Sequence, residues 1–118
     1  MSPELSKDTA YRLLSDSQRQ HLLSLLSQDG QGRIDGLARE IAAREKDIRP
    51  KNVSEKTQQR ITISLIHNHL PRLAEHNIVS YDQDSKRVVL MDVFGELETN
   101  LSDHTDDDSA LYQLFPDY

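Results

Sequence analysis

Hydrophobic residues recur at helical spacing in the first third of the chain. A short helix is predicted from Asp8, its capping residue, to Leu14. Ser15 and Gln18 then have the spacing of a capping box, which predicts a second helix start. The stripe that follows consists of Leu22, Leu23, Leu25 and Leu26. Gly30 and Gly32 are expected to end this helix, and residues 33–34 to form one short strand.

Two further helices are predicted beyond that point. Asp35 is expected to cap a helix over residues 36–45, with Leu37, Ala38 and Ile41 facing inward. Residues 46–54 are polar and predict a loop. Ser54 is expected to cap a long helix over residues 55–77, and Pro71 predicts a kink near residues 67–71 because it lacks a backbone donor.

A β-hairpin is predicted directly after the long helix. Residues 78–81 and 87–90 have strand-like patterns, separated by the turn residues 82–86. The hydrophobic residues Val93, Phe94, Leu97 and Leu101 then predict an amphipathic helix. We therefore expect a mainly α fold with a small β-hairpin, an α+β class. Its parts are a domain over residues 8–91, a C-terminal helix over 92–101 and an acidic tail over 102–118.

Charge is distributed unevenly along this chain of 118 residues, whose net charge is -6. From residue 92 onward there are eight acidic residues and no Lys or Arg, whereas residues 1–91 hold 12 acidic and 14 basic residues. The predicted domain is thus slightly basic, which is compatible with a phosphate-binding face. Arg outnumbers Lys nine to five and Asp outnumbers Glu 13 to seven, a bias that suits a halophilic protein.

The composition also narrows the class of protein. There is no Cys, which excludes disulfides and thiolate metal sites. No stretch approaches the length of a membrane span or a signal peptide, so we expect a soluble, cytoplasmic protein with no membrane partner. His67 and His69 are two residues apart and point away from each other on a helix, so no metal or other cofactor is expected. No nucleophile motif or phosphate-cradling loop is present, and we expect no enzymatic activity.

Three segments resemble winged helix-turn-helix DNA-binding proteins of the ArsR-like type. Residues 35–42 resemble the second helix of that family, and residues 63–73 followed by 77–82 resemble its recognition helix and wing. The form His-Leu-Pro-x-Leu, at residues 69–73, is similar to an uncharacterised winged-helix domain of haloarchaeal, and hence archaeal, proteins. The resemblance covers about residues 10–91. The nine-residue segment 46–54 departs from it, because a compact helix-turn-helix has a shorter turn.

The resemblance implies a transcription regulator that binds double-stranded DNA through the long helix in the major groove and the wing on the adjacent backbone or minor groove. On a wheel of 100° per residue, a core face is predicted for Gln59, Ile63, Ile66, Leu70, Leu73 and Ala74. The residues predicted to contact DNA are Lys56, Thr57, Arg60, Ser64, His67, Asn68, Arg72 and, in the wing, Lys86 and Arg87. Ile61 and Leu65 fall on that same polar face, where the loop, a dimer partner and thymine methyl groups are alternative contacts.

The C-terminal residues suggest partners other than DNA. Val93, Phe94, Leu97 and Leu101 are predicted to form a homodimer interface, with packing on the chain's own first helix as the alternative. We interpret the acidic tail as a disordered end, and the alternatives are a protein partner or competition with DNA. The alternative function for the whole chain is a winged-helix module that binds another protein and no DNA.

Overall fold

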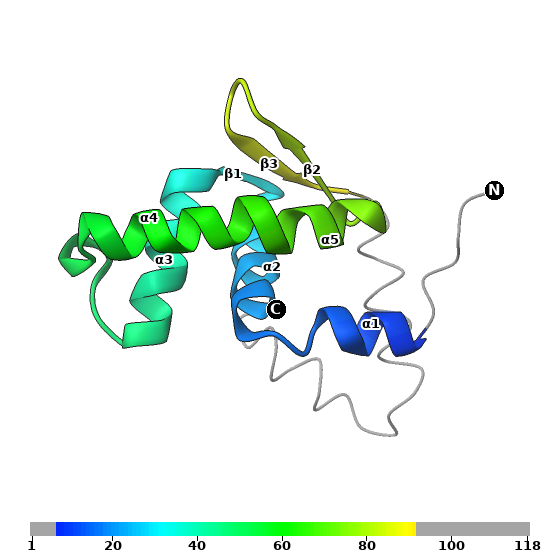
Figure 1. Cartoon of the computed structure of the whole chain (residues 1–118), viewed down its shortest axis with the longest axis horizontal. Coiled ribbons are helices and arrows are strands. Elements are labelled where there is room, and N and C mark those ends of the chain that lie inside the picture. Colours follow the sequence, from blue (N-terminus) through cyan, green and yellow to red (C-terminus); the bar gives the residue numbers. More distant parts are fainter. Residues whose placement is uncertain (1–6, 92–118) are drawn as a thin grey trace.

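The computed structural model describes residues 7–91, and the predicted helix 92–101 and tail 102–118 lie outside this range. The chain is mainly helical with one small antiparallel sheet, which confirms the expected α+β class (Figure 1). Its elements are α1 (Lys7–Leu13), α2 (Ser17–Asp29), β1 (Gln31–Arg33), α3 (Ile34–Lys46), the 3-10 turn η1 (Pro50–Asn52), α4 (Glu55–Ser64), the π-helical turn η2 (Leu65–His69), α5 (Leu70–Glu75), β2 (Val79–Asp82) and β3 (Arg87–Leu90).

The N-cap of helix α2 lies one residue later than predicted. The carboxylate of Asp16 accepts the backbone N–H groups of Gln18 and Arg19 at 2.8 and 3.3 Å, so Asp16 is the N-cap. The hydroxyl of Ser15 instead donates to the carbonyl of Arg12 at 2.7 Å. The predicted capping box at Ser15 is therefore wrong, because Ser15 is used at the end of α1 and leaves the free N–H groups to Asp16.

The other helix ends agree with the sequence at Gly30 and Ser54 and differ at Asp8 and Asp35. Asp8 lies in the first turn of α1, which begins at Lys7, so the prediction that it caps this helix is wrong. Gly30 ends α2 with φ of 79°, a left-handed conformation that glycine adopts without steric cost. Ser54 Oγ accepts the N–H of Thr57 at 3.1 Å and caps α4. Helix α3 begins at Ile34, and the N-cap position is Arg33 with no side-chain bond. The prediction that Asp35 caps this helix is wrong because Asp35 already lies within its first turn.

The sheet has three strands in the order β1–β3–β2, all antiparallel. The predicted hairpin is confirmed as β2 and β3, with Val79 opposite Leu90. The predicted short strand is displaced by two residues to Gln31–Arg33 and pairs with the far edge of β3, with Gly32 opposite Val88. This pairing anchors the base of the hairpin to the loop between α2 and α3.

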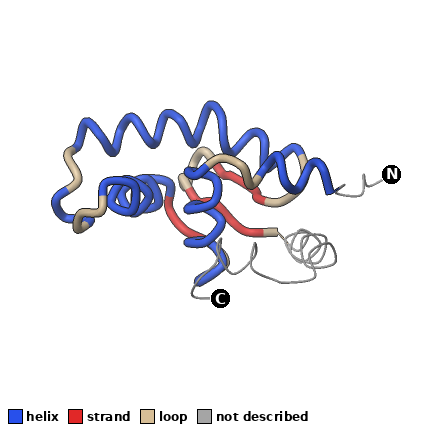
Figure 2. The backbone as a smooth tube through the Cα atoms, turned by 90° about the horizontal axis from the view of Figure 1, so that it is seen from below, coloured by secondary structure: helices blue, strands red, loops and turns tan. Residues whose placement is uncertain are grey.

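Helices α4 and α5 and the turn between them form one long rod along an outer side of the molecule (Figure 2). The irregularity predicted near Pro71 is present as the π turn Leu65–His69, in which the N–H of Leu70 bonds to the carbonyl of Leu65. This wide turn ends just before Pro71, whose ring would otherwise crowd the preceding turn of a regular helix. Both turn-flanking residues, Ser64 and Leu70, keep right-handed helical dihedrals, so the rod continues through the turn.

A single hydrophobic core lies behind this rod. Side chains with at most 2% exposure come from α2, α3, the π turn, α5 and the sheet, and they include Leu22, Leu23, Leu26, Ile41, Leu65, Leu73, Ile78 and Val88. Burial of such side chains from several elements stabilises the relative placement of those elements. The helices of residues 7–91 are all too short or too polar to cross a bilayer.

Candidate nucleic-acid interface

The long rod buries a different face in each of its halves. In α4 and the π turn the buried hydrophobic residues are Ile61 and Leu65, at 6% and 0% exposure, and His69 at the end of the turn is buried as well. In α5 they are Leu70 and Leu73, as predicted. The predicted core positions Gln59, Ile63 and Ala74 are wrong, because all three are exposed and Ile63 is 59% exposed.

The π turn explains this error. A residue advances the direction of an α-helix by 100°, and a π turn holds one residue more than an α turn. A wheel drawn at constant pitch across residues 55–77 therefore loses register by about one residue at the π turn. Ile61 and Leu65, which the wheel placed on the polar face, consequently contact the core, and their burial leaves no surface for the alternatives of a dimer partner or a thymine methyl group. Val53, from the loop that was the third alternative, belongs to the same buried cluster.

The exposed surface of α4 and the π turn carries two Lys or Arg side chains, three amides or imidazoles and one isoleucine, with a single carboxylate, Glu55, at the N-terminal end of α4 one turn before Gln59. We define this outward face as Lys56, Gln59, Arg60, Ile63 and His67, all of which are exposed. Within residues 7–91 none of these side chains has a hydrogen bond or ion pair, so their polar groups are available to a ligand. Lys56, Arg60 and His67 were predicted for this surface, whereas Gln59 and Ile63 were missed because the wheel had assigned them to the core.

Four of the predicted contact residues lie on the flanks of the outward face. Thr57 is half-buried, and its hydroxyl lies 2.9 Å from that of Ser54 at the helix cap. Ser64 Oγ donates to Oε1 of Gln18 on α2 at 3.0 Å, so the prediction that Ser64 faces outward is wrong. Asn68 and Arg72 are exposed and bonded to each other, Nε to Oδ1, at 2.8 Å. Arg72 lines a pocket with α1, which places this pair on the α1 side of the rod.

The tip of the β2–β3 hairpin carries both signs of charge. Lys86 and Arg87 are exposed there, and Lys86 has a left-handed φ of 60°. Arg87 Nη1 donates to Gln31 of β1 at 3.2 Å. The carboxylate of Asp82 organises the turn by accepting the N–H of Asp84 at 3.0 Å and the hydroxyl of Ser85 at 3.1 Å. The hairpin therefore offers two cations beside two carboxylates.

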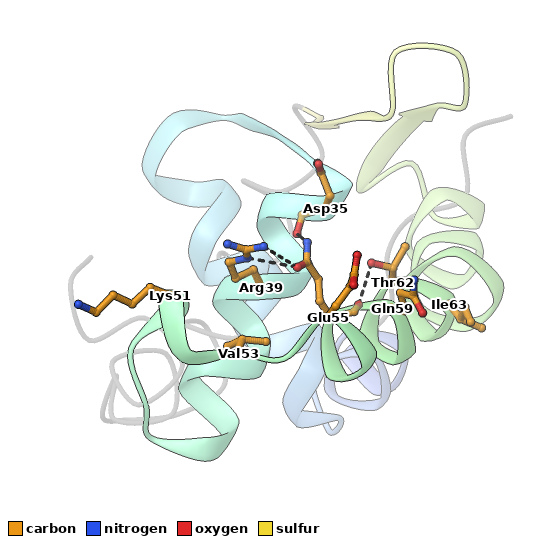
Figure 3. A pocket seen from close by; sticks show the side chains of 9 residues that line it. Asp35, Arg39, Lys51, Val53, Glu55, Gln59, Thr62 and Ile63 are labelled. Carbon is orange, nitrogen blue, oxygen red and sulfur yellow. Dashed lines mark hydrogen bonds between the residues drawn. The ribbon is translucent and has the colours of Figure 1, made fainter.

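A groove of about 610 Å³ lies between the N-terminal half of α3 and the length of α4, and it shares Gln59 and Ile63 with the outward face (Figure 3). Its floor is crossed by Gln58, whose Oε1 accepts Nε and Nη2 of Arg39 at 3.2 and 2.9 Å. The amide of Gln58 also donates to the carbonyl of Asp35 at 2.9 Å. These bonds hold α4 at a defined position on α3. The charged residues that line the groove are Arg39 and Lys51, both exposed, and the carboxylates Asp35 and Glu55.

A buried polar network supports the other side of the rod. Arg19 and His69 are 8% and 2% exposed. Arg19 Nη1 lies 3.2 Å from His69 Nδ1, and His69 Nε2 lies 3.0 Å from Oε1 of Gln18. Because a guanidinium only donates, Nδ1 accepts and Nε2 carries the proton of a neutral imidazole. Burial lowers the pKa of His69, and the charges of Arg19 and Arg72 add to this effect against the opposing charge of Asp16.

The arrangement of histidines does not assemble a metal site within residues 7–91. No group of three His, Cys, Asp or Glu side chains in this part of the chain is placed to hold an ion. His67 lies on the outward face, whereas His69 is committed to the buried network.

Comparison with known proteins gives one match. A protein-family model described as a domain of unknown function, DUF7344, matches residues 11–89, more than half of the chain. The matched range begins within α1 and ends within β3, so it includes the outward face, the groove and the buried network. No curated protein and no solved structure matches the chain.

Proposed function

The chain belongs to the DUF7344 family of domains of unknown function, and from the geometry of its long rod we propose that it is a winged-helix protein that binds double-stranded DNA. In this proposal α3 and the rod form the helix-turn-helix, and β2 and β3 form the wing. The sheet order β1–β3–β2 and the placement of the hairpin directly after the rod support that assignment. A role in transcription regulation follows from DNA binding in this type of protein and forms part of the proposal.

One observation carries the proposal, namely the outward face. Lys56, Arg60 and His67 project from one side of an exposed helix, where the one acidic residue of α4 is Glu55 at its N-terminal end. The rod lies on the outside of the molecule, where a duplex groove can reach it (Figure 2). A helix with this kind of surface is what the major groove admits.

The chemistry of the outward face suits both parts of DNA recognition. Lys56 and Arg60 supply donors for phosphates or for guanine, and the amide of Gln59 has the geometry for a bidentate contact with adenine. Ile63 supplies an apolar surface for a thymine methyl group. Lys86 and Arg87 on the hairpin then contact the backbone beside the groove. We propose Gln59 and Ile63 as base contacts in place of Ser64, which faces α2.

The experiment is a fluorescence anisotropy titration of the full chain with a pool of random duplexes at low salt. The test variant is Lys56→Gln/Arg60→Gln, which removes two cations from the outward face. We expect its dissociation constant to rise about tenfold or more, since each lost contact of this kind costs roughly 1–3 kcal/mol. Selection of bound duplexes from the same pool then gives the preferred sequence.

The matched control is Arg44→Gln/Lys46→Gln, which removes the same charge from the C-terminal half of α3. Arg44 bonds to Ser24 of α2 at 3.2 Å and lines a pocket between α2, β1 and α3, away from the outward face. An equal loss of affinity in both variants would show a general charge effect and contradict the proposal. Absence of binding at low salt in the folded wild-type protein would also contradict it.

The alternative function is binding of another protein, and Ile63 is the observation that favours it. An isoleucine with 59% exposure at the centre of a helix face is also typical of a helix that packs on a partner. The balanced charge of the hairpin tip, with Asp82 and Asp84 beside Lys86 and Arg87, gives less attraction to DNA than a basic wing would. The titration separates the two, because a protein-binding module has no salt-dependent affinity for the random duplexes.

A further inference from the structure

A second cluster of cations lies away from the outward face, in a pocket between α1 and α5. The pocket encloses about 310 Å³, and its charged lining residues are Arg12, Arg19, Arg72, Glu75 and His76. Three guanidinium groups thus face one carboxylate, which leaves an excess of two positive charges when His76 is neutral. A volume of this size is at the lower end of the range for small-molecule sites.

The charge of Arg19 at the base of this pocket has no counter-ion in the described part of the chain. Its side chain is 8% exposed, and its three bonds go to the carbonyls of Leu13 and Arg12 and to the ring of His69. All of these partners are neutral, and no carboxylate among residues 7–91 lies within 4.0 Å of its guanidinium. A buried charge is normally paired, because burial without a counter-ion is costly.

Arg12 and Arg72 extend the positive charge to the mouth of the pocket. Both are exposed; Arg72 bonds only to the neutral amide of Asn68, and the side chain of Arg12 has no partner within residues 7–91. Guanidinium groups bind planar or tetrahedral oxyanions through paired donors. The positive potential also reaches the neighbouring His69, where burial lowers the pKa and the charges of Arg19 and Arg72 lower it further.

We propose that this pocket binds the phosphate group of a small molecule. Arg12 and Arg72 hold the oxygens from the two sides of the pocket, and Arg19 provides the buried positive charge beneath them. His76, which also lines the pocket, offers an imidazole N–H to the phosphate. The site is separate from the outward face and its existence does not depend on DNA binding.

The test measures thermal unfolding of the full chain with inorganic phosphate as the probe, replacing chloride at constant ionic strength. A ligand that binds the folded state raises the unfolding temperature as its concentration exceeds its dissociation constant. We expect a rise in the wild-type protein and, in amide NMR spectra, phosphate-dependent shifts concentrated in α1 and α5. The variant Arg12→Gln/Arg72→Gln should increase the dissociation constant for phosphate at least about tenfold.

The controls distinguish a specific phosphate site from a general effect of salt and from a contact with DNA. Arg44→Gln/Lys46→Gln should keep the full phosphate-dependent rise, and equal rises in both variants would overturn the proposal. In a duplex titration without phosphate, Arg12→Gln/Arg72→Gln should bind DNA as tightly as that control. A selective loss of DNA affinity would show that Arg12 and Arg72 bind a phosphodiester of the DNA backbone. That result would overturn the proposal that the bound phosphate belongs to a small molecule. If the wild-type protein does not bind DNA, the proposal for the outward face fails, and the phosphate measurement still tests the pocket.

Discussion

Arg19 donates from Nη1 to Nδ1 of His69 across 3.2 Å, and this bond joins the start of α2 to the π turn of the long rod. The same guanidinium bonds through Nε to the carbonyl of Leu13 at 2.6 Å, so it also holds the end of α1. A cation thus occupies one side of the imidazole, and burial together with this cation lowers the pKa of His69 against the carboxylate of Asp16, which lies 3.7 Å from Nε2. Protonation of His69 would place a second positive charge and a second donor on the same contact.

The free energy of unfolding is therefore expected to decrease in mildly acidic solution. The pKa of His69 is lowered from its ordinary value of 6.5 in the folded chain, first by burial, so the unfolded chain binds the proton more readily. Stability should be full above about pH 6.5, fall as the pH drops below that value, and level off below the lowered pKa of the folded state. Thermal unfolding measured between about pH 8 and pH 5 checks this.

Two histidine variants test whether His69 causes this decrease in the free energy of unfolding. In His69→Gln the decrease should become smaller, with a remainder from His21, whose pKa is lowered by burial and by Arg44. In His67→Gln, which changes an exposed side chain of the outward face, the decrease should be that of the wild type. An unchanged pH dependence in His69→Gln would refute the role given to the buried network.

The rotation of the buried face at the π turn predicts opposite effects for two neighbouring side chains. Leu65 is fully buried, so Leu65→Ala should lower the free energy of unfolding by about 2–5 kcal/mol. Ile63 is 59% exposed, so Ile63→Ala should change it by no more than about 0.5 kcal/mol. Urea unfolding of both variants measures the difference. A helical wheel of constant pitch predicts the larger loss for Ile63→Ala instead of Leu65→Ala, and this result would contradict the π turn.

A further prediction concerns which residue is the N-cap of α2. Asp16→Ala should lower the free energy of unfolding by about 1 kcal/mol, because two backbone N–H groups lose their acceptor. Asp16→Asn keeps an acceptor oxygen and should recover most of this loss. Ser15→Ala, at the residue that the sequence pattern favoured, should change the value by no more than about 0.5 kcal/mol. Urea unfolding that shows a larger effect for Ser15 than for Asp16 would reverse the assignment.

Most of the fold is carried by local signals that the sequence displays. Ser54 and Gly30 mark helix ends through their own side-chain or backbone properties, and both act where they were predicted. The hairpin follows from two β-rich segments around a polar turn, and it forms at β2 and β3. Such features depend on residues a few positions apart, and their physical cause is visible in a short window.

The parts that were missed depend on residues far apart in the chain. Gly32 pairs with Val88, 56 positions later, and no local pattern indicates that the short strand joins the hairpin. The π turn holds His69 against Arg19 and Gln18 of α2, and the helical spacing of hydrophobic residues does not indicate this contact either. Because the helical wheel did not include the π turn, it lost register and placed Gln59 and Ile63 in the core. The presence of Pro71 was the one local signal that the period would be interrupted nearby.

The last prediction concerns the salt dependence of DNA binding, and it separates the charged from the apolar part of the outward face. A protein that neutralises a phosphate releases counter-ions, and each such contact contributes about 0.9 to the slope of log affinity against log salt. Arg60→Gln should therefore weaken binding and reduce the magnitude of the slope by about 0.9. Ile63→Ala should weaken binding to the selected sequence with no change in slope, since the variant alters no charge. Anisotropy titrations at four or more salt concentrations give both quantities. A slope unchanged in Arg60→Gln would remove Arg60 from the phosphate contacts, and a slope altered in Ile63→Ala would show that the helix docks differently.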